Sequence, residues 1–177
     1  GTLTIAGGST SNIDYVMKSS GASLNPGAVG TSSAYLPGSV TIDNTYGGTA
    51  GAGGTPTSGY VTASQSSLTS YATTSHGVLI NNAIYADSGI TLKGGSNGNY
   101  GIYINGVPMV SATNPLTLTG MSNSNNAVYS SGALTAVSDA ITIVGNSTTG
   151  QAVNLAAALT AQGVSITANG TTAATIA

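Results

Sequence analysis

The sequence contains no cysteine, phenylalanine, tryptophan, arginine or glutamate, and it has a single histidine. Without cysteine, neither a disulfide nor a thiolate metal site can stabilise the fold. Without phenylalanine and tryptophan, a core must be built from Val, Ile, Leu and Ala with some of the nine tyrosines. Because most of these side chains are small, we expect a thin core.

Charge is also scarce. The ionisable side chains other than tyrosine and histidine are Lys18, Lys93, Asp14, Asp43, Asp87 and Asp139. Binding to nucleic acid needs several cationic contacts with phosphates, so this composition predicts no nucleic-acid partner. It equally lacks the polybasic segment that attracts an anionic membrane surface. A net charge of −2 leaves association between copies of the chain almost unopposed.

Long apolar runs are missing too. No segment reaches the roughly 18 to 20 residues of a membrane helix, and no charged start followed by an apolar stretch marks a signal peptide. We therefore expect no membrane insertion, and a mature or internal piece of protein. The 40% of hydrophobic residues nevertheless predicts a buried core, and the length predicts a single domain over residues 1–177.

A triplet of apolar residue, threonine and apolar residue recurs along the chain. Its clear copies are Leu3-Thr4-Ile5, Val40-Thr41-Ile42, Ile90-Thr91-Leu92, Leu116-Thr117-Leu118 and Ile141-Thr142-Ile143, with weaker ones at Leu68-Thr69-Ser70 and Val164-Ser165-Ile166. From residue 90 onward the steps are 26, 25 and 23 residues. A period of this size is typical of repeat architectures.

Two more apolar columns keep the same period. One passes through Val78, Ile102, Val128 and Val153, and the other passes through Ile84, Met109, Leu134 and Leu159. Clusters rich in Gly, Ser and Asn follow the triplets, as in "GGSNGN" at 94–99 and "GNSTTGQ" at 145–151, and we interpret them as turns. Alternation places the flanking apolar residues inward and the central threonine outward.

Three short strands per period predict an all-β fold, a parallel β-helix (β-solenoid) of about seven coils of about 25 residues each. The stretch 151–163 has the Ala and Leu content of a helix, but its columns align with the repeat and predict strands. Residues 47–59, "GGTAGAGGTPTSG", break the period and predict a Gly-rich loop inserted between coils.

The pattern resembles the repeat region of filamentous haemagglutinin-like bacterial exoproteins and adhesins. The resemblance rests on "GIYINGVPMVSATNPLTLTGMSNSNN" at 101–126 and "AVYSSGALTAVSDAITIVGNSTTGQ" at 127–151. It implies a right-handed winding and secretion to the bacterial cell surface. It also implies a role in adhesion, biofilm matrix or filament formation, and it supplies no catalytic residues.

Parallel β-helices also include polysaccharide-degrading enzymes, which need clustered carboxylates. Here the four aspartates are far apart in sequence. Asp87 and Asp139 each precede a threonine triplet, so we expect them in equivalent places two coils apart, where they cap turns. No catalytic, cofactor-binding or metal-binding residue is therefore predicted. Ice binding by the Thr column is only a remote alternative, because such a surface needs a second outward Thr column and the sequence does not have one.

The histidine and three tyrosines are the remaining candidates for contacts. His76 precedes the Val78 column and is interpreted as a turn residue. Tyr85, Tyr103 and Tyr129 lie near the strand columns, where they either cover the core edge or offer a stacking surface to a sugar or a neighbouring subunit.

We therefore expect a non-enzymatic structural segment of an extracellular filament or surface adhesin. Its expected partners are copies of itself, and the alternative is a glycan-binding or host-surface-binding module using the tyrosines or residues 47–59. Neither end of the sequence shows a polar, charged cap, which predicts that more solenoid continues or that subunits stack head to tail.

Overall fold

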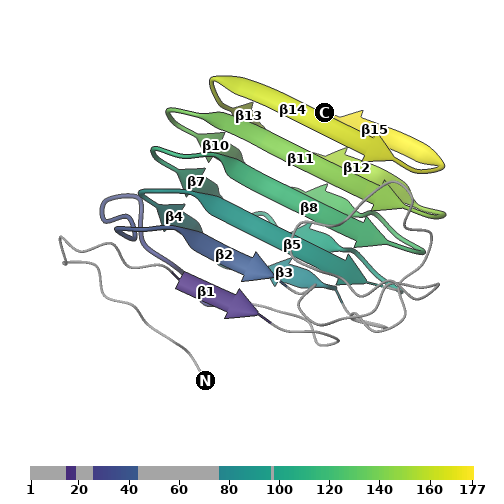
Figure 1. The fold of residues 1–177 in the computed structure, drawn as a ribbon, viewed down its shortest axis with the longest axis horizontal. Helices are drawn as coiled ribbons and strands as arrows, with labels where there is room; N and C mark the ends of the chain where they lie inside the picture. Colours follow the sequence, from purple (N-terminus) through teal and green to yellow (C-terminus); the bar gives the residue numbers. More distant parts are fainter. Residues whose placement is uncertain (1–14, 19–25, 44–75, 97) are drawn as a thin grey trace.

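The computed structural model describes residues 15–18, 26–43, 76–96 and 98–177, and within them the chain is an all-β parallel solenoid (Figure 1). Three parallel sheets enclose one apolar core. Sheet A contains β1 (Tyr15–Lys18), β2 (Val40–Asp43), β5 (Ile90–Ser96), β8 (Leu116–Ser122), β11 (Ala140–Ser147) and β14 (Gly163–Asn169), in that order. Sheet B contains β3 (Val78–Ile80), β6 (Ile102–Ile104), β9 (Val128–Ser130), β12 (Gln151–Leu155) and β15 (Thr172–Ile176). Sheet C contains β4 (Ile84–Ala86), β7 (Met109–Ser111), β10 (Leu134–Ala136) and β13 (Leu159–Thr160).

Each turn of the solenoid contributes one strand to each sheet, in the order B, C, A. The described residues form about four complete turns, from β3 to β14, and β15 begins the next turn. The predicted β-solenoid with three strands per turn is confirmed. The stretch 151–163, which has a helix-like composition, contains strands β12 and β13 with short connections and reaches the first residue of β14.

The repeat columns are the ladders of the three sheets. In sheet A the central threonines Thr41, Thr91, Thr117 and Thr142 are successive Cα partners, followed by Ser165. In sheet B the Val78 column pairs as predicted, and in sheet C the Ile84 column does the same. The central threonines Thr91, Thr117 and Thr142 are each partly exposed between two fully buried apolar neighbours, so the predicted alternation is confirmed.

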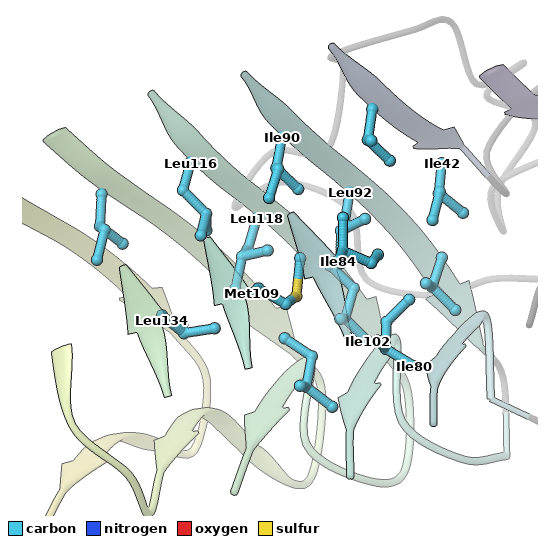
Figure 2. Close-up of a cluster of buried hydrophobic side chains, with 14 of the residues drawn as sticks. Ile42, Ile80, Ile84, Ile90, Leu92, Ile102, Met109, Leu116, Leu118 and Leu134 are labelled. Atoms are coloured by element: carbon cyan, nitrogen blue, oxygen red, sulfur yellow. The ribbon is translucent and has the colours of Figure 1, made fainter. Parts of the chain in front are cut away.

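The core consists of these inward ladders, and it contains no aromatic side chain among the described residues. Figure 2 shows Ile90, Leu92, Leu116 and Leu118 of sheet A pointing into the same interior as Ile84 and the side chains of the other two sheets. Stacking therefore removes one apolar side chain after another from water without requiring a large residue.

The Gly- and Ser-rich clusters differ from the prediction, because their first residues are strand residues rather than turn residues. β5 continues through Gly94 to Ser96, and the chain leaves the sheet only afterwards. The buried serines Ser96, Ser122 and Ser147 form a ladder at the ends of β5, β8 and β11. Each accepts a hydrogen bond at 3.0 Å from the backbone N–H three residues later. Ser122 and Ser147 also donate to a carbonyl of the preceding turn at 2.7 Å.

The N-terminal half departs from the simple repeat. β2 pairs directly with β5, although 50 residues separate Val40 from its partner Ile90. The weak triplet Leu68-Thr69-Ser70 lies outside the described residues. The other neighbour of β2 is β1, which the triplet pattern did not predict. The triplet Leu3-Thr4-Ile5 and the predicted loop at 47–59 lie outside the described residues.

Residues 26–36 cover the edge of sheet C nearest the N-terminus, which the sequence did not reveal. Val29 bridges to Ile84 and Leu36 bridges to Ala86, with hydrogen bonds of 2.8 to 3.1 Å between their backbones and residues 83–87. Val29 and Leu36 are 5% and 2% exposed, so they close this side of the core.

Candidate functional site

Four aromatic side chains gather at sheet B. Tyr103 and Tyr129 are Cα partners on β6 and β9, at the outward position between two buried residues. His76 and Tyr100 each stand two residues before a strand of the same sheet, so the turn period places one beside the other. We call these four residues the aromatic cluster.

The rings of the aromatic cluster stack on one another. Tyr103 lies 4.9 Å from His76, 5.0 Å from Tyr100 and 5.1 Å from Tyr129, measured between ring centroids, with interplanar angles of 19° to 26°. Tyr100 makes tilted contacts with His76 at 5.3 Å and with Tyr129 at 5.5 Å. Because the stacked rings cover one another's faces, a ligand meets mainly ring edges and hydroxyls.

An amide ladder borders the aromatic cluster. Asn105 follows β6 and donates from Nδ2 to Oδ1 of Asn81, which follows β3, at 3.1 Å. The Tyr103 hydroxyl lies 3.4 Å from Oδ1 of Asn105, to which it donates. Side chains of Asn and Tyr thus place hydrogen-bond donors and acceptors beside the rings.

Burial changes the acid–base properties of the aromatic cluster. Desolvation lowers the pKa of His76, and its Nδ1 atom is buried without a hydrogen-bond partner. Burial raises the pKa of Tyr100, and the nearby hydroxyls of Tyr103 and Tyr129 raise it further. Both shifts favour the neutral form, so the aromatic cluster is built as an uncharged stack.

The structure brings only some of the predicted residues together. Tyr103 and Tyr129 meet, and His76 joins them as a stacking residue, so its interpretation as a simple turn residue was incomplete. Tyr85 lies apart on sheet C, where its ring is 5.5 Å from the ring of Tyr35. Tyr100 was missed, although its offset from Ile102 equals that of His76 from Val78 and would have revealed it.

Asp87 and Asp139 both lie at the corner between sheets C and A, in different turns of the solenoid. They do not occupy the same position relative to the following strand. Asp87 is the third residue before β5 residue Ile90, whereas Asp139 is the second residue before the paired Ile141. The expectation of equivalent places is therefore wrong by one residue. Asp139 does cap locally, since its Oδ1 accepts a hydrogen bond from the N–H of Ala140 at 2.7 Å.

Metal and membrane features were sought in the described part of the chain. There, no group of three or more His, Cys, Asp or Glu side chains is arranged to hold a metal ion. No helix in that part is long and apolar enough to cross a membrane.

The last described turn of the stack exposes apolar side chains. β13, β14 and β15 each end their sheet, and Figure 1 shows them together at one end of the molecule. Val164 is 48% exposed and Ile176 is 56% exposed. The ladder partner of Val164, Ile141, is completely buried. Apolar side chains that are core residues elsewhere in the solenoid are therefore open to solvent here, on a surface we call the open end.

Comparison of the chain with protein-family models, curated proteins and solved structures finds no match. The likeness to haemagglutinin-like repeats therefore rests on the repeat pattern itself.

Proposed function

We propose that this chain is a structural β-solenoid segment of an extracellular filament or bacterial surface adhesin, which associates with copies of itself by coil stacking and has no catalytic role. A right-handed winding, and further turns formed by the N-terminal residues, belong to the same proposal. The observation that carries it is the stack itself, in which parallel ladders join each turn to the next in a chain with only six charged side chains, Lys18, Lys93, Asp14, Asp43, Asp87 and Asp139.

Copies of a β-solenoid can associate through the edges of their strands. An exposed edge presents a row of unpaired N–H and C=O groups that templates another strand. In the inner described turns, as in β8 and β11, both rows are paired, one with the turn above and one with the turn below. An added turn or a second copy would continue these ladders and would bury the exposed apolar side chains, at about 25 cal/mol for each Å² of apolar surface.

The side-chain composition supports association. Soluble sheet proteins protect their edges with lysine, proline or inward-pointing charges. This chain has two lysines and four aspartates in 177 residues, and residues 140–177 have no charged side chain. Little electrostatic repulsion therefore opposes contact between copies.

Sedimentation velocity over a wide range of protein concentration tests the proposal, together with electron microscopy of the same samples. We expect a concentration-dependent shift from monomer to larger particles that are elongated along the stack. Raising the salt concentration should not dissolve them, because the contact is apolar and hydrogen-bonded rather than ionic. A monomer at every concentration would reject the self-association.

The aromatic cluster favours a second candidate, a glycan-binding or host-surface-binding adhesin module. Aromatic edges, tyrosine hydroxyls and the Asn81–Asn105 amide pair lie together on sheet B. The test is binding to a glycan array before and after Tyr129→Ala, with Tyr85→Ala on sheet C as the matched control. Loss of binding in Tyr129→Ala alone supports this candidate, and equal binding of both variants removes it.

A further inference from the structure

We propose that Asn105 is a site of spontaneous covalent modification, where its side-chain amide cyclises with the backbone nitrogen of Gly106 and is then hydrolysed to aspartate and isoaspartate. The only other reactant is solvent water. This inference goes beyond the proposed function and does not depend on self-association.

The sequence narrows the choice of site to three positions. An asparagine followed by glycine cyclises readily, because glycine has no Cβ to hinder the approach of its nitrogen to the asparagine side chain. Such pairs occur at Asn97-Gly98, Asn105-Gly106 and Asn169-Gly170. Asn97 lies outside the described residues, so the structure distinguishes between the other two pairs.

The backbone nitrogen of Gly106 is placed for this reaction. Asn105 directly follows β6, at the corner between sheets B and C. The N–H of Gly106 donates to the side-chain Oγ of Ser131 at 3.0 Å. The same Oγ donates to the carbonyl oxygen of Ile104 at 3.3 Å. The proton that the nitrogen must lose therefore already faces an oxygen atom that can accept it.

The corner also has room for the ring that forms. Asn105 and Gly106 are both exposed, so water reaches them. Gly106 has a φ of +68°, and a Cβ placed on it would meet no atom of the described residues within 4 Å. A five-membered imide between these two residues would thus meet no packed neighbour on the glycine side.

Asn169 has the same sequence pair but a different environment. It is the last residue of β14 and the Cα partner of Asn146, to whose Oδ1 its Nδ2 donates at 3.0 Å. A Cβ at Gly170 would lie 2.8 Å from the carbonyl oxygen of Ser147. Because strand pairing fixes the backbone that must rotate for ring closure, the reaction at Asn169 requires local opening first.

The reaction balances without any oxidant or metal. The nitrogen of Gly106 loses its proton and bonds to Cγ of Asn105, the Cγ–Nδ2 bond breaks, and Nδ2 leaves with that proton as ammonia. Water then adds to one of the two imide carbonyl carbons and breaks its bond to nitrogen. Opening at Cγ gives aspartate, and opening at the backbone carbonyl carbon gives isoaspartate, in which the main chain runs through the former side chain.

The residues around Asn105 can receive the new carboxylate. The Tyr103 hydroxyl already donates to Oδ1 of Asn105 at 3.4 Å, and Asn81 contacts the Nδ2 atom at 3.1 Å. Rotating the Asn81 amide by half a turn presents its own Nδ2 as a donor. Hydrogen bonds to a carboxylate are stronger than those to a neutral amide. Residues 94–138 have no charged side chain, so the modification introduces the first charge in this part of the chain.

Peptide mapping by mass spectrometry tests the proposal on the folded wild-type chain incubated at mildly alkaline pH. We expect Asn105 to react at least about tenfold faster than Asn169, because only Asn169 must wait for a paired strand to open. The matched control is the same chain in concentrated urea, where both pairs are unfolded and their rates should agree within about twofold. Equal rates in the folded chain, or an unmodified Asn105, would overturn the inference.

A titration tests the surroundings of the product independently. The carboxylate introduced by Asn105→Asp should have a pKa below the usual aspartate value, because hydrogen-bond donors favour its charged form. Adding Tyr103→Phe should raise that pKa, since it removes the hydroxyl that contacts position 105. Adding Tyr129→Phe, which removes the hydroxyl of the neighbouring stacked ring, should leave it unchanged. The same pKa in all three proteins, measured by NMR after circular dichroism has shown them folded, would contradict this placement of the carboxylate.

Discussion

Glycine occurs at the same ladder position of three successive strands because sheets A and B approach each other there. Gly94, Gly120 and Gly145 are Cα partners in β5, β8 and β11. A Cβ atom at Gly120 would lie 2.1 Å from the carbonyl oxygen of Ala127, a backbone atom that no side-chain rotation can move. The glycines that resemble a ligand-binding loop in the sequence are therefore required by backbone packing.

Gly120→Ala should consequently destabilise the solenoid by about 1–3 kcal/mol, the usual cost of forcing an extra carbon into a packed interior. Urea unfolding followed by circular dichroism measures this change. Gly163→Ala is the control, because a Cβ there meets no atom within 4 Å. It should be neutral or slightly stabilising, since alanine restricts the unfolded chain. Equal unfolding midpoints for the two variants would contradict the packing explanation.

His76 makes stability depend on pH in one direction. Burial lowers its pKa in the folded state, so between the folded pKa and the unfolded value of about 6.5 the unfolded chain binds more protons. Stability is therefore fully present above about pH 6.5, and it decreases as the pH falls towards the folded pKa.

Urea midpoints measured between about pH 5 and pH 8 test this dependence, within a range above the usual titration of aspartate. The wild-type midpoint should fall on the acidic side. His76→Phe keeps an aromatic ring against Tyr100 and Tyr103 but cannot be protonated, so its midpoint should stay constant. A parallel decline in both proteins would assign the effect to other groups.

At the scale of the strand, the sequence predicted what repeats and missed what occurs once. Apolar alternation around Thr91, Thr117 and Thr142 located three strands of sheet A and their register, because stacked turns impose one period on them all. β1 carries no threonine triplet, and Val40 and Ile90 are partners across 50 residues, so the period could not place either feature. The cover formed by residues 26–36 depends on long-range contacts that no local pattern encodes.

For the candidate surfaces too, the sequence predicted the contacts that repeat from turn to turn and missed those that occur once. The stacking of Tyr103 on Tyr129 could be read from the repeat, since both stand at one offset in adjacent turns. The recruitment of His76 and Tyr100 requires the conformation of the corner before each strand, which a periodicity of strand residues does not specify. Exposure of Val164 follows from its place in the last described sheet A strand, so it became visible only when the ladder order was known.

At the scale of the whole molecule, stability should grade along the stack. In a solenoid each turn contacts only its neighbours, so turns that are paired on both sides open less readily than a turn paired on one side. β8 and β11 have partners on both sides, whereas β14 has one. Amide hydrogen exchange at low protein concentration should therefore be fastest in β14 and β15 and slowest in β8.

The proposed association of copies would change this gradient in a specific way if it used the edge of β14. As the protein concentration rises through the dissociation constant, the amides of β14 that face outward should become protected, while those of β8 keep their rates. In Val164→Lys the fast exchange of β14 should persist at all concentrations, because the charged edge does not accept a partner. Slow exchange of β14 in a dilute monomer would show instead that one paired side is sufficient to hold this strand closed, and the exposed edge would then not be the weak point of the molecule.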